Sequence, residues 1–250
     1  LYGIIDLNKK FSTGQWLDLA IKKIRNIHKR KKTPILVGGT GLYFQSLIKG
    51  LAEIPEIPLK FRNKIRFMQK KDGQKKFYKK LIKIDPSIKN KFDPSDMQRS
   101  IRAFEIKSFT KISMYEWLNN TKSEFKNEDF IKLYIDFVRE DLIKKISLRS
   151  TKMIEEGAIK EVKKFIKLKI KKDLSVNKVI GIDELTQYLD KKINLNQAQE
   201  LISIKTRQYA KRQATWARSR MSSWKKINPT MIAGYIKKLK NSSVKLDQLT

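Results

Sequence analysis

The sequence predicts an α/β fold that is rich in helix, with a parallel sheet at its core and a long helical insertion. A short apolar run, TPILVGG at 33–39, lies between two segments of helical periodicity. A second apolar run, KLYIDFV at 132–138, is followed by another long helical pattern. Helices that alternate with short apolar strands are typical of parallel sheets. Between the two runs, Pro55 and Pro58 mark a change of composition, which indicates a hinge that leaves the first domain.

The first domain is expected to contain a helix, a strand and a glycine turn. Trp16, Leu19 and Ile24 recur at helical spacing, so residues 15–30 are predicted to form an amphipathic helix. The run at 33–39 is expected to be a buried parallel strand that ends at two glycines. Ligands of such sheets bind beyond the carboxyl ends of the strands, so the turn after this strand is well placed for a ligand.

The insertion is expected to be helical and very basic. The pattern runs from Phe61 to about Leu118, and a helix is predicted to begin near Ser95. Turns are predicted at Asp72-Gly73, Asp85-Pro86 and Asp93-Pro94. Polar residues at 121–130 indicate a return loop. The predicted domains are therefore 1–53, the insertion at 54–128, and the remainder of the core with the C-terminal helices at 129–250.

The last part is predicted to begin with a strand at 132–138 and to be mainly helical after it. A long amphipathic helix is expected from Arg139 to Glu156, because Gly157 follows it. Further helices are expected at 158–169, 182–190 and 196–224, and the tail after Ser242 is expected to be frayed.

The net charge is +32, from 57 Lys and Arg against 25 Asp and Glu. Such a charge favours a polyanion such as nucleic acid. A genome rich in A and T would also write many Lys, Ile and Asn codons, and this bias explains part of the charge. It does not explain the 12 Arg, which are suited to phosphate because their guanidinium is a planar fork. Eight of them fall between Arg99 and Arg220.

Several classes of protein are disfavoured by composition. The chain has no Cys, so disulfides and thiolate metal sites are excluded. No apolar run approaches the ~18 residues of a membrane-spanning helix. The first residues, which begin with Leu1, do not resemble a secretory signal. We therefore expect a cytoplasmic protein with no membrane partner.

The first motif that could carry chemistry is GGTGLYFQSLIKGL at 38–51. Gly38 and Gly39 would let backbone approach a ligand closely, and Thr40 offers a hydroxyl at the turn. The alternative is a tight connection between a strand and a helix. The turn does not match GxGxxG, and GxxxxGK[ST] occurs nowhere in the 250 residues.

The second motif is QRSIRAFEI at 98–106. Arg99 and Arg102 would share one face of a helix, with Gln98 and Ser100 adjacent. Such side chains can contact phosphates and base edges. The alternative is a solvated basic face.

The third motif is IKTRQYAKRQATWARSRM at 204–221. Lys205, Gln208 and Arg212 would share one helical face, while Tyr209 and Trp216 would face the core. The alternative, an amphipathic core helix, explains the apolar stripe but not the density of Arg.

Together these segments resemble tRNA dimethylallyltransferases in order and spacing. The motifs are GGTGLYFQSLIKGL, QRSIRAFEI and TRQYAKRQATW, with LYGIIDLNKKFSTGQW and VIGIDELTQYL at the corresponding places. The resemblance covers essentially the whole chain. It implies a P-loop-type α/β core whose helical insertion clasps the anticodon stem-loop of tRNA. It also implies transfer of a dimethylallyl group from its diphosphate to the exocyclic N6 amine of the adenosine 3′-adjacent to the anticodon, with Mg²⁺ as cofactor and a monomeric enzyme.

The resemblance also implies roles for individual residues. Thr40 matches the threonine at the target adenine, and Arg149 matches an Arg directed at the diphosphate; these are the expected catalytic residues. The residues expected to bind tRNA are Arg62, Gln98, Arg99, Ser100, Ile101, Arg102, Lys178 and Gly181. The residues expected to bind phosphate or diphosphate are Gly38, Gly39, Lys205, Arg207 and Arg212. No metal ligand is predicted, and His28 is expected to lie on a helix surface.

One departure from the family pattern lies at the front of the sequence. In this family a strand, a P-loop of the GPTASGK type and an acidic general base precede the segment that matches Leu1, and none of them is among these 250 residues. A P-loop grips diphosphate through backbone amides and a Lys. We therefore expect this chain alone to bind tRNA but to be weakly active or inactive.

Two other functions remain open at this point. A non-catalytic basic RNA-binding protein, truncated or degenerate, would bind every RNA in a salt-sensitive way without preferring the anticodon loop. A prenyltransferase of free adenine nucleotides would not need the long basic insertion.

Overall fold

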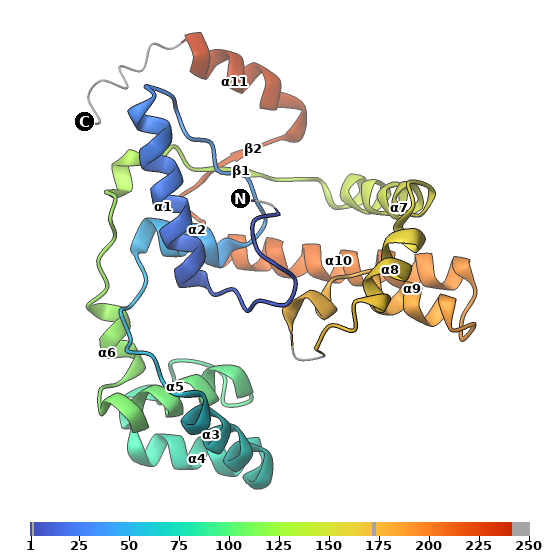
Figure 1. Cartoon of the computed structure of the whole chain (residues 1–250). Coiled ribbons are helices and arrows are strands. Elements are labelled where there is room, and N and C mark those ends of the chain that lie inside the picture. Colours follow the sequence, from blue (N-terminus) through green and yellow to red (C-terminus); the bar gives the residue numbers. More distant parts are fainter. Residues whose placement is uncertain (2, 172–173, 242–250) are drawn as a thin grey trace. The chain divides into compact units, whose positions relative to one another are not determined.

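The computed structural model describes residues 1, 3–171 and 174–241 (Figure 1), so the predicted frayed tail lies outside the described residues. It divides into two compact units. One comprises Leu1–Phe44 and Glu128–Thr250, and the other comprises Gln45–Asn127. The second unit therefore starts inside a helix, rather than at the predicted hinge, and ends at the predicted return.

The first unit is mainly helical with a small sheet. Its elements are α1 (Thr13–Lys29), the start of α2 (Gly41–Lys49), β1 (Leu133–Ile135), α7 (Arg139–Glu155), α8 (Ala158–Lys167), η3 (Ser175–Lys178), α9 (Ile182–Leu189), α10 (Leu195–Arg220), β2 (Lys225–Ile227), η4 (Pro229–Met231) and α11 (Ile232–Asn241). The predicted helices are present with shifts of a few residues at their ends. The fold class is confirmed as α/β and rich in helix.

The helix ends follow from local capping. α1 begins after Ser12, because Ser12 and Gln15 form a capping box of reciprocal side-chain bonds to backbone N–H groups. Asn194 and Gln197 form the same arrangement before α10. α7 ends where predicted, because Gly157 has a φ of +109°, a left-handed conformation that favours glycine.

The described sheet consists of β1 and β2, which are parallel. Leu133 pairs with Lys225 and Ile135 pairs with Ile227. The strand predicted at 132–138 is confirmed. The sequence did not predict β2, because two of its three residues are Lys and give no apolar pattern.

The prediction of a buried strand at 33–39 is wrong for this structure. The segment is not in a strand, and Ile35 and Val37 are 83% and 79% exposed. The physical reason is that the strands described here pair only with each other, so this apolar run has no hydrogen-bonding neighbour. Apolar composition alone does not make a strand without a ladder partner.

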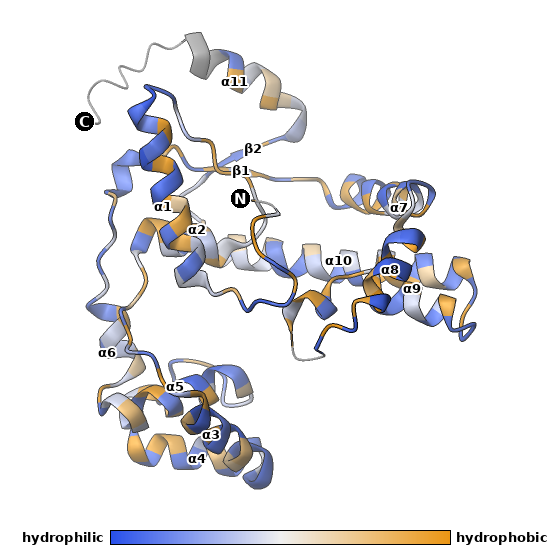
Figure 2. Cartoon of the chain, viewed as in Figure 1, coloured by the Kyte–Doolittle hydropathy of each residue, from blue (hydrophilic) through white to orange (hydrophobic). Residues whose placement is uncertain are grey.

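The second unit is a compact set of helices around its own core. It contains the end of α2, α3 (Leu59–Asp72), α4 (Gln74–Ile84), η1 (Pro86–Ile88), α5 (Met97–Thr110) and α6 (Met114–Asn119), with η2 (Asn127–Asp129) at the junction with the first unit. Phe77, Leu81, Ile88 and Ile106 are fully buried in its core. Figure 2 shows apolar residues interleaved with polar ones along α3, α4 and α5, as expected for amphipathic helices.

Two details of this unit follow from backbone geometry. α5 begins at Met97 rather than near Ser95, because the Asp96 side chain accepts a hydrogen bond from the backbone N–H of Arg99. After α2, Gly50 has a φ of +83°, and a Cβ there would lie 2.1 Å from the carbonyl oxygen of Lys122. Only glycine fits this position.

Candidate functional site

The glycine turn at 38–41 is held in the first unit by α10. The side-chain amide of Gln213 donates a hydrogen bond to the carbonyl oxygen of Gly39 at 2.9 Å. A Cβ on Gly41 would lie 2.2 Å from the indole ring of Trp216, so the turn packs directly on this ring. Two segments that the sequence analysis singled out separately therefore meet in space. Gln213 and Trp216 lay within the third motif but were not predicted as site residues.

Thr40 lies on this turn, immediately before α2. It is exposed, and its carbonyl oxygen accepts a hydrogen bond from the backbone N–H of Tyr43 at 3.0 Å. The Tyr43 ring stacks on Trp16 of α1, with centroids 4.4 Å apart, and Phe44 makes an edge contact with Trp224 at 5.6 Å. Because these aromatic contacts fix the first turn of α2, the exposed residue Thr40 lies on a well-anchored turn.

The predicted phosphate-binding residues of α10 have different surroundings. The Arg212 guanidinium lies 5.6 Å from the centroid of the Tyr209 ring, which is a cation–π contact. Arg207 lines a shallow groove with Ser147 of α7 and Ser203. Arg149 is exposed on α7. The helices α7 and α10 are joined beside it by a buried bond between the hydroxyls of Ser150 and Ser203 at 2.7 Å.

Lys205 is engaged in a different way. Its ammonium group contacts the carboxylate of Glu184, which is 1% exposed, and lies 3.4 Å from that of Asp183. The hydrogen bond with Glu184 is the main cause of a raised pKa at Lys205, and Asp183 adds to it, while burial acts in the opposite direction. Lys205 thus joins α10 to the start of α9. It is less free to bind a phosphate than Arg207 or Arg212, which make no such ion pair among the described residues.

We expect Lys205→Met to destabilise the first unit by about 1–3 kcal/mol, because the buried carboxylate of Glu184 would lose the cation that contacts it. Chemical unfolding followed by circular dichroism measures this, with Lys211→Met, an exposed residue of the same helix, as the matched control. Because the pKa of Lys205 is raised in the folded state, its pairing with Glu184 contributes fully to stability below the unfolded-state pKa of about 10.4. This contribution to stability is lost as the pH rises through the raised folded-state pKa. Equal stability of the two variants would contradict the assignment.

The loop before α9 carries two further predicted residues. Lys178 is exposed at the end of η3. Gly181 is buried and has a φ of +107°, and its backbone N–H donates to Glu184 at 2.7 Å. That N–H is therefore satisfied within the protein. Contact of this loop with RNA stays a prediction, for which the exposed Lys178 is the more accessible residue.

In the second unit, the QRSIR segment presents only part of its side chains. Gln98, Arg99 and Arg102 lie on the accessible side of α5. Ser100 is 0% exposed, donates to the Asp96 carbonyl oxygen at 2.8 Å and accepts from the Gln74 amide at 2.9 Å. Ile101 packs against the core. Helical periodicity turns residue 100 inward. The predicted contact of the Ser100 side chain with tRNA is therefore corrected, since this side chain joins α4 to α5 through its hydrogen bonds.

Arg62, which was also predicted to bind tRNA, lies on α3 beside Arg66. Both face the carboxylate of Glu105, at 3.4 and 3.7 Å from their Nε atoms. Arg102 of α5 faces the same carboxylate at 3.6 Å. The structure therefore brings Arg62 and Arg102 together around one buried acid. Neither Arg66 nor Glu105 was predicted as a site residue. Arg66 follows Arg62 by four residues and Glu105 follows Arg102 by three, so helical spacing could have placed each on the same face as its neighbour.

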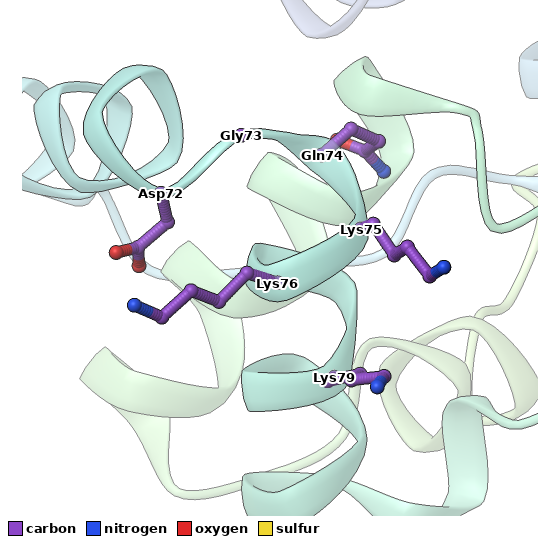
Figure 3. Close-up of a pocket in the computed structure, with 6 residues that line it drawn as sticks. All are labelled: Asp72, Gly73, Gln74, Lys75, Lys76 and Lys79. Carbon is purple, nitrogen blue, oxygen red and sulfur yellow. The ribbon is translucent and has the colours of Figure 1, made fainter.

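A shallow hollow lies at the turn between α3 and α4 (Figure 3). It is lined by Asp72, Gly73, Gln74, Lys75, Lys76 and Lys79. Figure 3 shows the side chain of Lys76 extending on the side of Asp72, whereas Lys75 and Lys79 extend elsewhere from α4. The pKa of Asp72 is lowered, chiefly by a hydrogen bond from Lys80. The hollow extends the basic surface of this unit.

The described residues contain no group of three His, Cys, Asp or Glu side chains that could hold a metal ion. No helix in the described part of the chain is long and apolar enough to cross a membrane.

Comparison with known proteins extends this description. The family model for IPP transferase matches residues 1–220. A tRNA dimethylallyltransferase from Pelagibacter ubique is 73% identical over 250 residues, which is 100% of this chain and 80% of that relative. A tRNA dimethylallyltransferase from Wolbachia sp. subsp. Drosophila simulans is 36% identical over 217 residues, 86% of this chain and 73% of that relative.

Solved structures are similar as well. The full-length tRNA isopentenylpyrophosphate transferase from Bacillus halodurans aligns with a TM-score of 0.58 and 30% identity, over 90% of this chain and 70% of that chain. A eukaryotic dimethylallyltransferase, solved in snapshots of its action on tRNA, aligns with a TM-score of 0.71 and 29% identity, over 85% of this chain and 54% of that chain.

Proposed function

Because this chain belongs to the IPP transferase family, we propose that it transfers a dimethylallyl group to tRNA. The acceptor is the exocyclic N6 amine of the adenosine 3′-adjacent to the anticodon, and the donor is dimethylallyl diphosphate. The family identified from the sequence motifs is thereby confirmed. We also propose that dimethylallyl diphosphate is the donor and that Mg²⁺ accompanies it.

One observation supports this function most directly. The turn that carries Thr40 is held against α10 through Gln213 and Trp216, so the residue that we assign to the acceptor adenine lies on a turn beside a helix rich in Arg. Transfer of a prenyl group needs both elements. The amine must be oriented toward the allylic carbon, and negative charge must be stabilised on the departing diphosphate.

The reaction balances without any redox partner. A bond forms between N6 and the first carbon of the dimethylallyl group, and the bond from that carbon to the diphosphate oxygen breaks. Diphosphate leaves with the electron pair of that bond, and N6 loses a proton to solvent. In our proposal the Thr40 hydroxyl accepts a hydrogen bond from the amine, which orients its lone pair. Arg149, Arg207 and Arg212 offer the cations that diphosphate requires.

Prenyl transfer is tested with labelled dimethylallyl diphosphate and a synthetic anticodon stem-loop RNA. The matched control RNA carries inosine in place of the acceptor adenosine, because inosine has a carbonyl oxygen where adenosine has the amine. We expect label in the first RNA and none in the second. Salt-sensitive binding of every RNA without label would favour the non-catalytic alternative, and preferential labelling of AMP over the stem-loop would favour the nucleotide prenyltransferase.

Thr40→Val should lower the single-turnover rate of transfer about 10- to 100-fold, because the isosteric side chain cannot accept the hydrogen bond that orients the amine. Thr40→Ser keeps the hydroxyl and should retain most of the rate. The measurement uses excess protein over labelled RNA, so that binding does not limit. Equal rates for the Val and Ser variants would remove Thr40 from the mechanism.

The level of activity of these 250 residues is a separate proposal. They contain no GxxxxGK[ST] segment, so backbone amides of a P-loop do not contribute to donor binding within them. We propose that the chain binds tRNA but prenylates it slowly compared with the 1–10³ s⁻¹ that is roughly typical of enzymes. Turnover within that range by the purified 250-residue chain would contradict this.

We propose three further properties of the protein. Mg²⁺ should accompany the diphosphate, which a titration of donor binding with Mg²⁺ tests. The protein should be a monomer, which light scattering measures. Its expected compartment is the cytoplasm, which localisation of a tagged chain would test.

A further inference from the structure

A buried carboxylate in the second unit is surrounded by three arginines. Glu105 of α5 is 1% exposed. Its oxygens lie 3.4 Å from Arg62 Nε, 3.7 Å from Arg66 Nε and 3.6 Å from Arg102 Nη1. Two of these arginines come from α3 and one comes from α5, so a single acid gathers cations from two helices.

The charges in this cluster do not cancel. One carboxylate balances one guanidinium, which leaves two positive charges in excess. The three arginine side chains are 38%, 50% and 42% exposed, so the cluster lies at the surface of the unit although its carboxylate is buried. An anion that approaches from solvent could therefore contact several guanidinium groups at once.

The hydrogen bonding of the cluster is also incomplete. The contacts of Glu105 with the arginines exceed the usual 2.7–3.2 Å of an N–H···O bond. Glu105 Oε1 and Arg62 Nε are buried without a hydrogen-bond partner among the described residues. Buried polar groups are normally satisfied, and exceptions are common where a ligand or a water completes the site.

We propose that Glu105 is a positioning residue that holds Arg62, Arg66 and Arg102 as one phosphate-binding site for the tRNA backbone. Arg66 is then an additional RNA-binding residue. This inference rests on the proposed function, because tRNA supplies the phosphate. A purely structural role, in which Glu105 only joins α3 to α5, is the competing explanation.

The surroundings favour a nucleic acid over an isolated small anion. On the same face of α3, Lys70 follows Arg62 and Arg66 at four-residue spacing and is exposed, and the helix has no acidic residue before Asp72. A row of three cations along one helix face matches a row of phosphates better than it matches one ion.

The first test measures binding of a fluorescent anticodon stem-loop RNA as a function of salt. Arg66→Ala should weaken binding about tenfold and reduce the slope of log affinity against log salt by about 1. Lys64→Ala is the matched control, since it removes the same charge from the same helix about half a turn away from Arg62 and Arg66 and should have a clearly smaller effect. Arg66→Lys keeps the charge but loses the planar guanidinium, so its loss of RNA affinity should lie between those of Arg66→Ala and Lys64→Ala.

The second test asks whether Glu105 acts through Arg66. In Glu105→Gln the arginines lose their common partner, so preference for the stem-loop over an unstructured RNA of equal length should fall. Non-specific binding should be unchanged or stronger, because a negative charge is removed. Adding Arg66→Ala to Glu105→Gln should cost less affinity than it does in the unchanged protein. Circular dichroism confirms that each variant is folded.

Two outcomes would overturn the inference. Arg66→Ala, Arg66→Lys and Lys64→Ala could weaken binding equally, which would mean that only net charge matters. Alternatively, Glu105→Gln could lower the stability of the protein but change neither its preference for the stem-loop RNA nor the effect of Arg66→Ala. This result would show that Glu105 only joins α3 to α5. Both differ from failure of the proposed function, in which the unchanged protein itself shows no preference for the stem-loop.

Discussion

Phe77→Ala should destabilise the second unit by about 3–5 kcal/mol and abolish its binding to the anticodon stem-loop. Phe77 is 0% exposed on α4, and its ring lies 5.0 Å from that of Phe104 on α5. The residual cavity would lie where α4 packs on the helix that carries Arg99 and Arg102. Since native domains are stable by only about 5–15 kcal/mol, a loss of this size removes much of the stability of the unit.

Hydrogen exchange of the backbone amides of α4, followed by mass spectrometry, measures the local loss, and RNA binding measures its consequence. Phe67→Ala is the matched control. It makes the same chemical change on α3, where the side chain is 69% exposed, and should leave exchange in α4 almost unchanged. Faster exchange of α4 in both variants to the same extent would show that the core does not depend on Phe77.

Gly41→Ala should slow prenyl transfer about 100-fold, because a displacement of the Thr40 turn by about 1 Å is enough to cost that much. The added Cβ would lie 2.2 Å from the Trp216 ring, which is anchored in α10 and cannot move as a flexible chain end would. Either the turn or the indole must shift, and overpacking of this kind typically costs about 1–3 kcal/mol.

Gly234→Ala provides the control for this substitution. A Cβ at Gly234, in α11, would meet nothing within 4 Å. It should therefore keep most of the transfer rate, although it makes the same chemical change in a helix. The single-turnover assay used for Thr40 separates the two variants, and equal rates would refute the close contact with Trp216.

Most helices could be predicted from the sequence because their signals are local. Capping residues, glycines at helix ends and apolar spacing lie within a few residues of the boundary that they determine. Gly157 ended α7 for this reason, and Asn194 with Gln197 started α10. The predicted strand at 33–39 failed, and β2 was missed, because a strand exists only when a partner forms the other half of the ladder.

The sequence by itself determined the family, the fold class and the candidate residues, because the motifs that carry them are contiguous and ordered along the chain. Only the tertiary structure decided which of those residues remain available. It placed Gln213 and Trp216 against the glycine turn, engaged Lys205 with Glu184, and turned Ser100 into the interior. It also gathered Arg62, Arg66 and Arg102 around Glu105. Such pairings depend on the packing of helices that are distant in sequence, and no local pattern records which partner each side chain meets.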